Sequence, residues 1–324
     1  MSTTLFFLVP IGMLAVVWSF CFVGACFPTG GLPGPPYSNT ILAEPSLVAY
    51  WPLSDLPGAA PAPPPGSTSV GTAADLSGNG HPGTYINPPA YMPGAAIPQI
   101  GTNPTLNLHQ ASIVPGDAFA PGSKNLPACV DFEGGYVSIP WAANSPALTD
   151  FTLEAWIKPK WNVTGFVWVV FSATTTNGTG FTLDINDQNQ WQFTIGNGTA
   201  STVVNTMVTA AVNNTVSYVA VTFDSATQVL SLWINPGSDT SAAPTPAWPP
   251  DPATVTPYVA IDPTQPVTFF IGAGDNQDAQ TPRTQGGGAG APLHPFQGLI
   301  QSVALYSTAL DPTDLASHFA DGTA

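Results

Sequence analysis

Hydrophobic and polar residues alternate along most of this chain with the period of two that is typical of β-strands. In TDFTLEAWIKP an apolar series alternates with a more polar one: Phe151, Leu153, Ala155 and Ile157 against Thr152, Glu154, Trp156 and Lys158. Such alternation predicts a strand with one face in the core and the other toward solvent. Further strands are expected in LVAYWPL, ACVDF, FVWVVFSAT, GFTLDIN, QWQFTIGN, VSYVAVTFD, VLSLWIN, VTFFIGA and LIQSVALYS.

Turn-forming sequences separate these strands, among them TTNGTG, NDQNQ, DSATQ and NPGSD. Many short strands at regular spacing, with almost no helical periodicity, predict an all-β fold in the form of a two-sheet antiparallel jelly-roll sandwich. One helix is expected after the N-terminus, at 311–319. There Asp311 is suited to cap the helix, Pro312 takes the first helical position and Asp314 the third.

The N-terminal stretch LFFLVPIGMLAVVWSFCFVGAC, residues 5–26, carries no charge. A signal peptide has a positive first region and an apolar core of about 7–15 residues, whereas this segment begins with the uncharged MSTT and its apolar run is longer. A helix of this length spans about 33 Å, enough for a bilayer core of about 30 Å. We therefore predict a transmembrane helix over 1–26. VGAC also resembles a lipobox, so a lipoprotein with lipidated Cys26 is the alternative.

The remainder divides into a linker and one domain. Residues 27–46 are rich in Gly and Pro, which predicts a linker. The folded domain is expected over 47–324, with Pro-rich surface insertions near 57–73 and 238–257. The predicted topology is single-pass, with this domain in the periplasm or outside the cell.

Charge excludes some classes of partner. The chain has four Lys and Arg against 19 acidic residues, a net charge of −15. Nucleic acid is therefore not expected as a partner, because no basic patch is available to neutralise phosphates.

Three cysteines cannot all pair, so no disulfide framework is expected. Cys129, within ACVDF, is expected to be a small residue of the core.

Two loops contain oxygen-bearing side chains at alternating positions, the arrangement that suits Ca²⁺. ADLSGNGH contains Asp75 and Asn79, and LDINDQNQW contains Asp184 and Asp187. These four residues are the candidate metal ligands, and no other cofactor is expected. The alternative for each loop is an Asx turn, in which the same side chains accept hydrogen bonds from their own backbone.

Three tryptophans are candidates for contact with a ligand or partner: Trp161, Trp191 and Trp248. Trp248 lies in the second Pro-rich insertion, where an extended segment leaves a large aromatic ring few neighbours of its own to pack on. The other two lie in or beside predicted strands, where alternation places some tryptophans in the core.

A series of motifs in fixed order points to a family: AYWPLSD (49–55), ADLSGNGHPGTY (74–85), PGDAFAPGSKNLPACVDFEGGYVSIP (115–140), FTLEAWIKP (151–159), VSYVAVTFDSATQVLSLWINPG (216–237), FFIGAG (269–274) and FQGLIQSVALYSTALDPTDL (296–315). The series resembles laminin-G-like, concanavalin A-like lectin/glucanase jelly rolls over nearly all of 47–322. The resemblance implies two sheets packed face to face, with strands 47–53 and 298–306 adjacent. Gly134 and Gly135 are expected to form a tight turn between two strands. Where many members have Asp in the last motif, this chain has Gln301.

Catalysis is not expected. Glucanase members of the family carry a Glu-x-Asp-x-x-Glu strand that supplies the two carboxylates needed for glycoside hydrolysis. This chain has three glutamates, Glu44, Glu133 and Glu154, and none lies in that pattern.

Without a catalytic motif, the N-terminal segment carries most weight in the functional prediction. The main prediction is a non-catalytic accessory or scaffold subunit of a larger membrane protein complex, photosynthetic or respiratory for example. Its partners would be the bilayer and the other subunits. The alternative is a surface-anchored carbohydrate-binding module that recognises a glycan, with or without Ca²⁺.

Overall fold

Two antiparallel sheets form the body of the protein in a computed structural model, which describes residues 36–58, 67–88, 105–115, 128–141, 145–161, 166–174, 179–197, 201–236, 245–246, 260, 267–274 and 294–324. The strands of sheet A are β1 Leu47–Trp51, β4 Thr105–Ala111, β5 Ala128–Glu133, β7 Phe151–Pro159, β12 Ser217–Asp224, β13 Val229–Pro236, β14 Thr245–Pro246 and β16 Gln297–Tyr306. Those of sheet B are β2 Thr68–Ala73, β3 Gly83–Asn87, β6 Tyr136–Trp141, β8 Trp168–Thr174, β9 Thr179–Ile185, β10 Gln190–Asn197, β11 Ser201–Ala210 and β15 Val267–Ile271.

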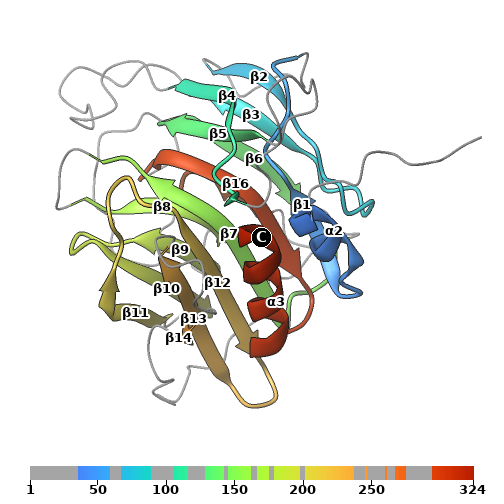
Figure 1. Ribbon diagram of the computed structural model, residues 1–324, viewed down its shortest axis with the longest axis vertical. Coiled ribbons are helices and arrows are strands. Elements are labelled where there is room, and N and C mark those ends of the chain that lie inside the picture. Colours follow the sequence, from blue (N-terminus) through green and yellow to red (C-terminus); the bar gives the residue numbers. More distant parts are fainter. Residues whose placement is uncertain are drawn as a thin grey trace, which may run out of the picture. The chain divides into compact units, whose positions relative to one another are not determined.

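The strand order confirms the predicted two-sheet sandwich. Sheet A runs β14-β13-β12-β7-β16-β5-β4, with β1 also paired to β16, and sheet B runs β11-β10-β9-β8-β15-β6-β3-β2 (Figure 1). The first and last strands are neighbours, as expected, with Tyr50 opposite Ala304. Five of the strands, β2, β3, β4, β11 and β14, are additional to those predicted, and β6 was expected only as the strand that follows Gly134 and Gly135.

The core lies between the sheets and is formed by the apolar series of each strand. On sheet A this series includes Leu153 and Ile157, and on sheet B it includes Phe181 and Phe269. Aromatic rings cross the interface: Phe151 stacks on Phe181 with ring centroids 4.8 Å apart. Burial of this apolar surface is the main force that holds the two layers together.

Two helices cover the outer face of sheet A, and this corrects the prediction for β7. Helix α2 spans Pro36–Ala43 and helix α3 spans Pro312–Thr323 (Figure 1). Phe319 of α3 stacks on Trp156 of β7 with centroids 5.8 Å apart. Thr152, Glu154 and Trp156 are therefore buried as well. The polar series of this strand lies beneath a helix, so alternation alone misassigned it to solvent.

The predicted helix near the C-terminus is confirmed as α3. The Asp311 carboxylate accepts hydrogen bonds from the backbone N–H groups of Thr313, at 2.6 Å, and Asp314, at 3.0 Å. These bonds satisfy two of the donors that a helix leaves free at its start, and they lower the pKa of Asp311.

All three of the predicted loop regions are partly structured. Within the predicted linker 27–46, α2 is folded against the domain, because Tyr37 and Ile41 are fully buried against sheet A and α3. Within the predicted insertion 57–73, residues 68–73 form β2, and within 238–257 residues 245–246 pair with β13 as β14. The sequence analysis missed one helix and two short strands in these regions, because the many Gly and Pro residues predicted loops throughout.

Gly134 and Gly135 connect strands of different sheets rather than neighbours in one sheet. β5 belongs to sheet A and β6 to sheet B, so the chain crosses the sandwich edge at this point. Gly134 has a φ of 92°, and a Cβ on Gly135 would lie 2.4 Å from Cγ of Leu106. Only glycine fits both conditions without displacement of the neighbours.

The predicted transmembrane helix 1–26 and Cys26 lie outside the described residues. Neither α2 nor α3, the helices of the part that is described, has the length and apolar character needed to cross a bilayer.

Candidate functional site

In the first predicted metal loop, the Asp75 side chain accepts hydrogen bonds from nearby backbone N–H groups and so stabilises a turn. Both oxygens of the Asp75 carboxylate accept backbone N–H groups: Oδ1 from Tyr50 at 3.0 Å and Ser77 at 2.9 Å, and Oδ2 from His81 at 2.8 Å. Asn79 presents its amide nitrogen to backbone carbonyls of β1, at 3.0 Å from the oxygen of Val48. The loop is thereby attached to the first strand.

These contacts determine the charge state of Asp75. Burial disfavours the ionised form, but the N–H donors of Tyr50, His81 and Ser77 outweigh it and lower the pKa of Asp75 below its usual value. A carboxylate whose two oxygens both accept N–H groups has little capacity left for a cation. The geometry is that of the Asx turn that the sequence left as the alternative.

The two acidic residues of the second predicted metal loop lie in different environments. Asp184 lies on β9 on the outer face of sheet B and is 4% exposed, whereas Asp187 is exposed in the turn to β10. The turn is organised by Asn186, whose Oδ1 accepts from the backbone of Gln188 at 3.0 Å and Gln190 at 2.9 Å. Within the ranges that the structure describes, no three His, Cys, Asp or Glu side chains gather as a metal-binding group.

The predicted tryptophan contacts fall mostly in the core. Trp161 is 7% exposed and Trp191 is fully buried, and both belong to the cluster between the sheets. The backbone of Trp161 is held by Asn213, which donates to its carbonyl at 2.6 Å and accepts from its N–H at 3.0 Å. Burial excludes both rings from ligand contact in this conformation. Trp248 lies outside the described residues.

Glu154 is the centre of a buried polar network between β7 and the helices. Its carboxylate accepts from the hydroxyls of Tyr37 at 3.3 Å, Tyr306 at 2.7 Å and Tyr218. Nδ1 of His318 lies 3.1 Å from Oε2. The sequence did not predict this network, because its members come from α2, β7, β12, β16 and α3.

The ionisation states in the network support one another. Burial disfavours charge on His318, but the Glu154 carboxylate outweighs burial and raises the pKa of His318 to about 9. Burial also disfavours the charged form of Glu154 and so acts to raise its pKa. The positive charge and hydrogen bond of His318 outweigh burial and lower the pKa of Glu154. Burial and the Glu154 charge together raise the pKa values of the three tyrosines, which stay neutral donors. The result is a fully buried ion pair with no exposed surface for a substrate.

Cys129 is confirmed as a small buried residue, in the cluster on the outer face of sheet A. It is fully buried on β5, and its thiol lies 2.9 Å from the carbonyl oxygen of Ala111. Burial, supported by the negative charge of Asp131, raises its pKa to about 12. The thiol is therefore neutral at any physiological pH and unsuited to nucleophilic chemistry.

A transverse row of side chains crosses the outer face of sheet B and is the candidate ligand site. Each member lies directly opposite the next on the neighbouring strand, in the order Thr84, Ser138, Phe270, Ser172, Thr182 and Thr194. The row, here called the sheet B row, spans six strands, a distance of about 24 Å at normal strand spacing. Five of its members carry hydroxyl groups and one carries an aromatic ring.

Apolar and amide side chains flank the sheet B row. Tyr136 packs edge-on against Phe270 with ring centroids 5.6 Å apart. At the other end Gln192, paired with Asp184, accepts from the Asn186 amide at 3.4 Å and its own amide donates to Thr194 at 3.4 Å. The structure describes no helix on this face, because both described helices pack on sheet A.

Exposure differs along the row. Thr84, Ser138, Phe270 and Thr182 are half-buried, whereas Ser172 and Thr194 are buried. The polar positions of the separate strands were visible in the sequence. Their alignment into one row depends on register, which the sequence did not provide.

Comparison with known proteins gives one family. Residues 131–316, more than half of the chain, match the family model of the concanavalin A-like lectin/glucanases superfamily. No curated protein sequence matches the chain.

Solved structures with a similar fold include domain 4 of AbnA, a GH43 extracellular arabinanase from Geobacillus stearothermophilus, in complex with arabinotriose. It shares 14% identity at a TM-score of 0.44, over 84% of this chain and 98% of that domain. Trypanosoma rangeli sialidase in complex with sialic acid shares 13% identity at a TM-score of 0.46, over 95% of this chain and 39% of the sialidase. Botulinum neurotoxin type C shares 14% identity at a TM-score of 0.39, over 68% of this chain and 47% of that one.

Proposed function

This chain belongs to the concanavalin A-like lectin/glucanases superfamily, and from that membership we propose that it is a non-catalytic protein that binds carbohydrate. The observation that carries the proposal is the sheet B row. Sugar recognition requires hydroxyl, amide or carboxylate groups that exchange hydrogen bonds with sugar hydroxyls, together with apolar surface against the ring. The half-buried part of the row supplies hydroxyls on three strands around Phe270, from Thr84, Ser138 and Thr182.

The half-buried members define where a sugar would lie. Thr84, Ser138 and Phe270 come from adjacent strands, and Thr182 lies two strands beyond Phe270. A sugar ring packed against Phe270 would place a hydroxyl beside Ser138, and a further ring of the same glycan would lie beside Thr182. A glycan that runs across the strands, rather than along one of them, matches this arrangement.

The state of the glutamates favours binding without catalysis. Hydrolysis of a glycosidic bond needs two carboxyl groups on either side of the substrate. Glu154 is fully buried and held by four side chains, and Glu133 lies on sheet A, on the opposite layer from the row. Glu44 follows α2 and lies 3.4 Å from Nε2 of His318, outside sheet B.

The experiment is a glycan array with the full chain in mild detergent, followed by titration of the best glycan against variants. We expect Phe270→Ala to weaken binding about tenfold or more, and Thr182→Val about fivefold through loss of one hydrogen bond. Phe166→Ala and Thr68→Val are the matched controls, because Phe166 is another half-buried phenylalanine and Thr68 is an exposed strand threonine, both outside the row. Binding that these controls reduce and F270A does not would place the site elsewhere.

The membrane-scaffold function depends on residues 1–26, which lie outside the described part of the chain, and stays a prediction. The same preparation tests it. Absence of any glycan signal, together with co-purification of membrane subunits, would support the scaffold and overturn carbohydrate binding.

A further inference from the structure

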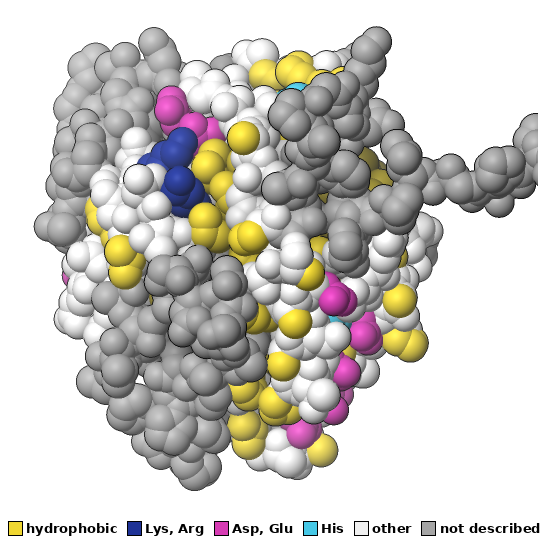
Figure 2. Space-filling view, in the orientation of Figure 1, with side chains coloured by type: hydrophobic (Ala, Val, Ile, Leu, Met, Phe, Trp, Pro, Cys, Tyr) yellow, Lys and Arg dark blue, Asp and Glu magenta, His cyan; other side chains and the backbone are white. Residues whose placement is uncertain are grey.

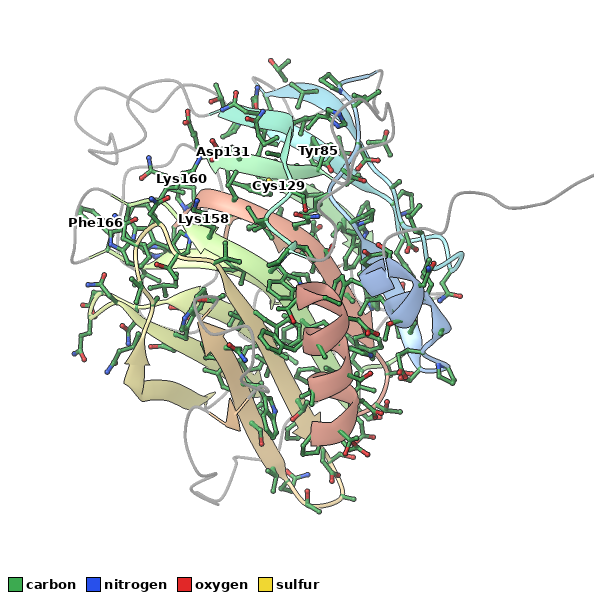
Figure 3. All side chains as sticks on the ribbon, in the orientation of Figure 1. Tyr85, Cys129, Asp131, Lys158, Lys160 and Phe166 are labelled. Carbon is green, nitrogen blue, oxygen red and sulfur yellow. The ribbon has the colours of Figure 1, made fainter. Side chains whose placement is uncertain are left out.

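Two of the four basic residues of this acidic chain lie together on the surface. The chain carries four Lys and Arg and a net charge of −15. Lys158, near the end of β7, and Lys160, just after it, point to the same side of sheet A, beyond the part that α3 covers (Figure 3). Figure 2 shows them as a basic patch with acidic and apolar side chains beside it. The other described side chains on that face are mostly uncharged or acidic (Figure 2).

Strand register places an acidic residue within the same patch. Asp131 of β5 and Lys158 of β7 both lie opposite Leu299 of β16, so the three residues form a short row across three strands. Nζ of Lys160 lies 2.8 Å from Oδ2 of Asp131. We call Asp131, Lys158, Lys160 and Leu299 the β7 patch.

The β7 patch contains two groups whose bonding is incomplete. Asp131 is 8% exposed, and its Oδ1 atom is buried without a hydrogen-bond partner. A buried polar atom left in this state is unfavourable, so it marks a position that a donor normally fills. The Lys158 ammonium forms no ion pair with any of the described residues. The patch therefore offers one free positive charge and one free acceptor.

These two groups together specify the chemistry of a ligand. The ammonium of Lys158 requires a negative group, and Oδ1 of Asp131 requires a hydroxyl or N–H donor. A simple anion satisfies the first and is repelled by the Asp131 carboxylate. A neutral sugar satisfies only the second. A sugar acid carries a carboxylate and neighbouring hydroxyls on one rigid ring and satisfies both.

We propose that the β7 patch is a second binding site, specific for carboxylate-bearing sugars of the uronic acid class. The sugar carboxylate pairs with Lys158, and a ring hydroxyl donates to Oδ1 of Asp131. Lys160, whose side chain is 39% exposed against 12% for Asp131, remains paired with Oδ2.

The patch is independent of the sheet B row, because it lies on the other layer of the sandwich. The net negative charge of the protein opposes the approach of any anion, so contact with the lysines has to supply the affinity. We therefore expect binding to weaken as salt is added, since exposed charges are screened over about 10 Å at 0.1 M ionic strength.

The test uses the full chain, oligogalacturonate as the probe and its methyl ester as the neutral counterpart. We expect measurable binding of the acid alone, a loss of about tenfold or more with Lys158→Gln, and near wild-type affinity with Lys158→Arg, which keeps the charge. Asp131→Asn should also weaken binding, because the amide of Asn adds a donor where the ligand hydroxyl donates. Thermal unfolding midpoints of all variants, measured alongside, show that each is folded.

Three results would overturn the proposal: no binding of oligogalacturonate by the wild-type chain, equal binding of the methyl ester, or wild-type affinity in K158Q. The variant F270A separates the two sites. Uronate binding that persists in F270A assigns it to the β7 patch, and uronate binding lost in F270A but kept in K158Q assigns it to the sheet B row and overturns this proposal.

Discussion

Nδ1 of His318 on α3 lies 3.1 Å from Oε2 of Glu154 on β7, and the two side chains are 1% and 0% exposed. Nε2 of the same ring lies 3.4 Å from Oε1 of Glu44, which follows α2. A single imidazole therefore connects the end of α2, the central strand of sheet A and α3. Because its charge depends on pH, the attachment of both helices depends on pH as well.

We expect stability to be highest between about pH 4.5 and 6.5. The pKa of His318 rises from 6.5 to about 9 on folding, so its contribution is complete below pH 6.5 and is lost as the pH rises through 9. The pKa of Glu154 falls from 4.5, so its contribution is present above pH 4.5 and is lost as the pH falls through the lowered value. The loss on the alkaline side is on the order of 3 kcal/mol.

Urea unfolding midpoints measured from acid to alkaline pH test this expectation. His318→Gln cannot titrate and should remove most of the slope between pH 6.5 and 9. Parallel curves for H318Q and the wild type would show that another group is responsible.

Glu154→Gln should destabilise the protein by about 3 kcal/mol or more. The change leaves the imidazolium of His318 buried with only the partly exposed Glu44 as a partner, and loss of one member of a buried ion pair typically costs about 3–5 kcal/mol. Glu133→Gln is the matched control, because Glu133 is exposed on β5 and should change stability by no more than about 0.5 kcal/mol. Equal free energies of unfolding for E154Q and E133Q would contradict the role assigned to the network.

Gly322→Ala should lower stability although it raises helix propensity. Alanine in a helix is usually favoured over glycine by about 1 kcal/mol. At position 322 of α3, however, the added Cβ would lie 2.4 Å from Cζ2 of the Trp156 ring. Ser317→Ala, on the exposed side of α3, should be slightly stabilising in the same thermal unfolding assay. A higher midpoint for G322A than for wild type would mean that the helix end moves away at little cost.

Calcium should have little effect on the Asp75 loop. Its carboxylate oxygens accept three backbone N–H groups, so we expect the same thermal midpoint in millimolar Ca²⁺ and in EDTA. Asp75→Asn should lower the midpoint equally in both conditions, because an amide supplies one acceptor oxygen in place of two. A calcium-dependent increase in the midpoint that D75N abolishes would support the metal site predicted from the sequence and contradict this expectation.

The sequence was sufficient for the sandwich and its order because alternation of apolar residues reports which strands have a buried face. Phe151, Leu153 and Ile157 were assigned to the core for this reason, and they lie there. Turn sequences and the Asp311 cap act within a few residues, so α3 was predictable at its first turn. The order of the motifs was sufficient to identify the family, because the motifs extend over most of the domain.

Tertiary structure decided which polar side chains are buried and which of them are in contact with one another. Glu154 and Trp156 occupy the polar series of β7, and burial of both follows from the position of α3, which is distant in sequence. The same limit applies to the candidate sites. Ser138, Phe270 and Ser172 form one row, and Asp131 meets Lys160, only through the register of strands far apart in the chain. Local sequence determines which faces are apolar; register and helix packing determine which polar groups meet, because those contacts form between segments with no local relation to each other.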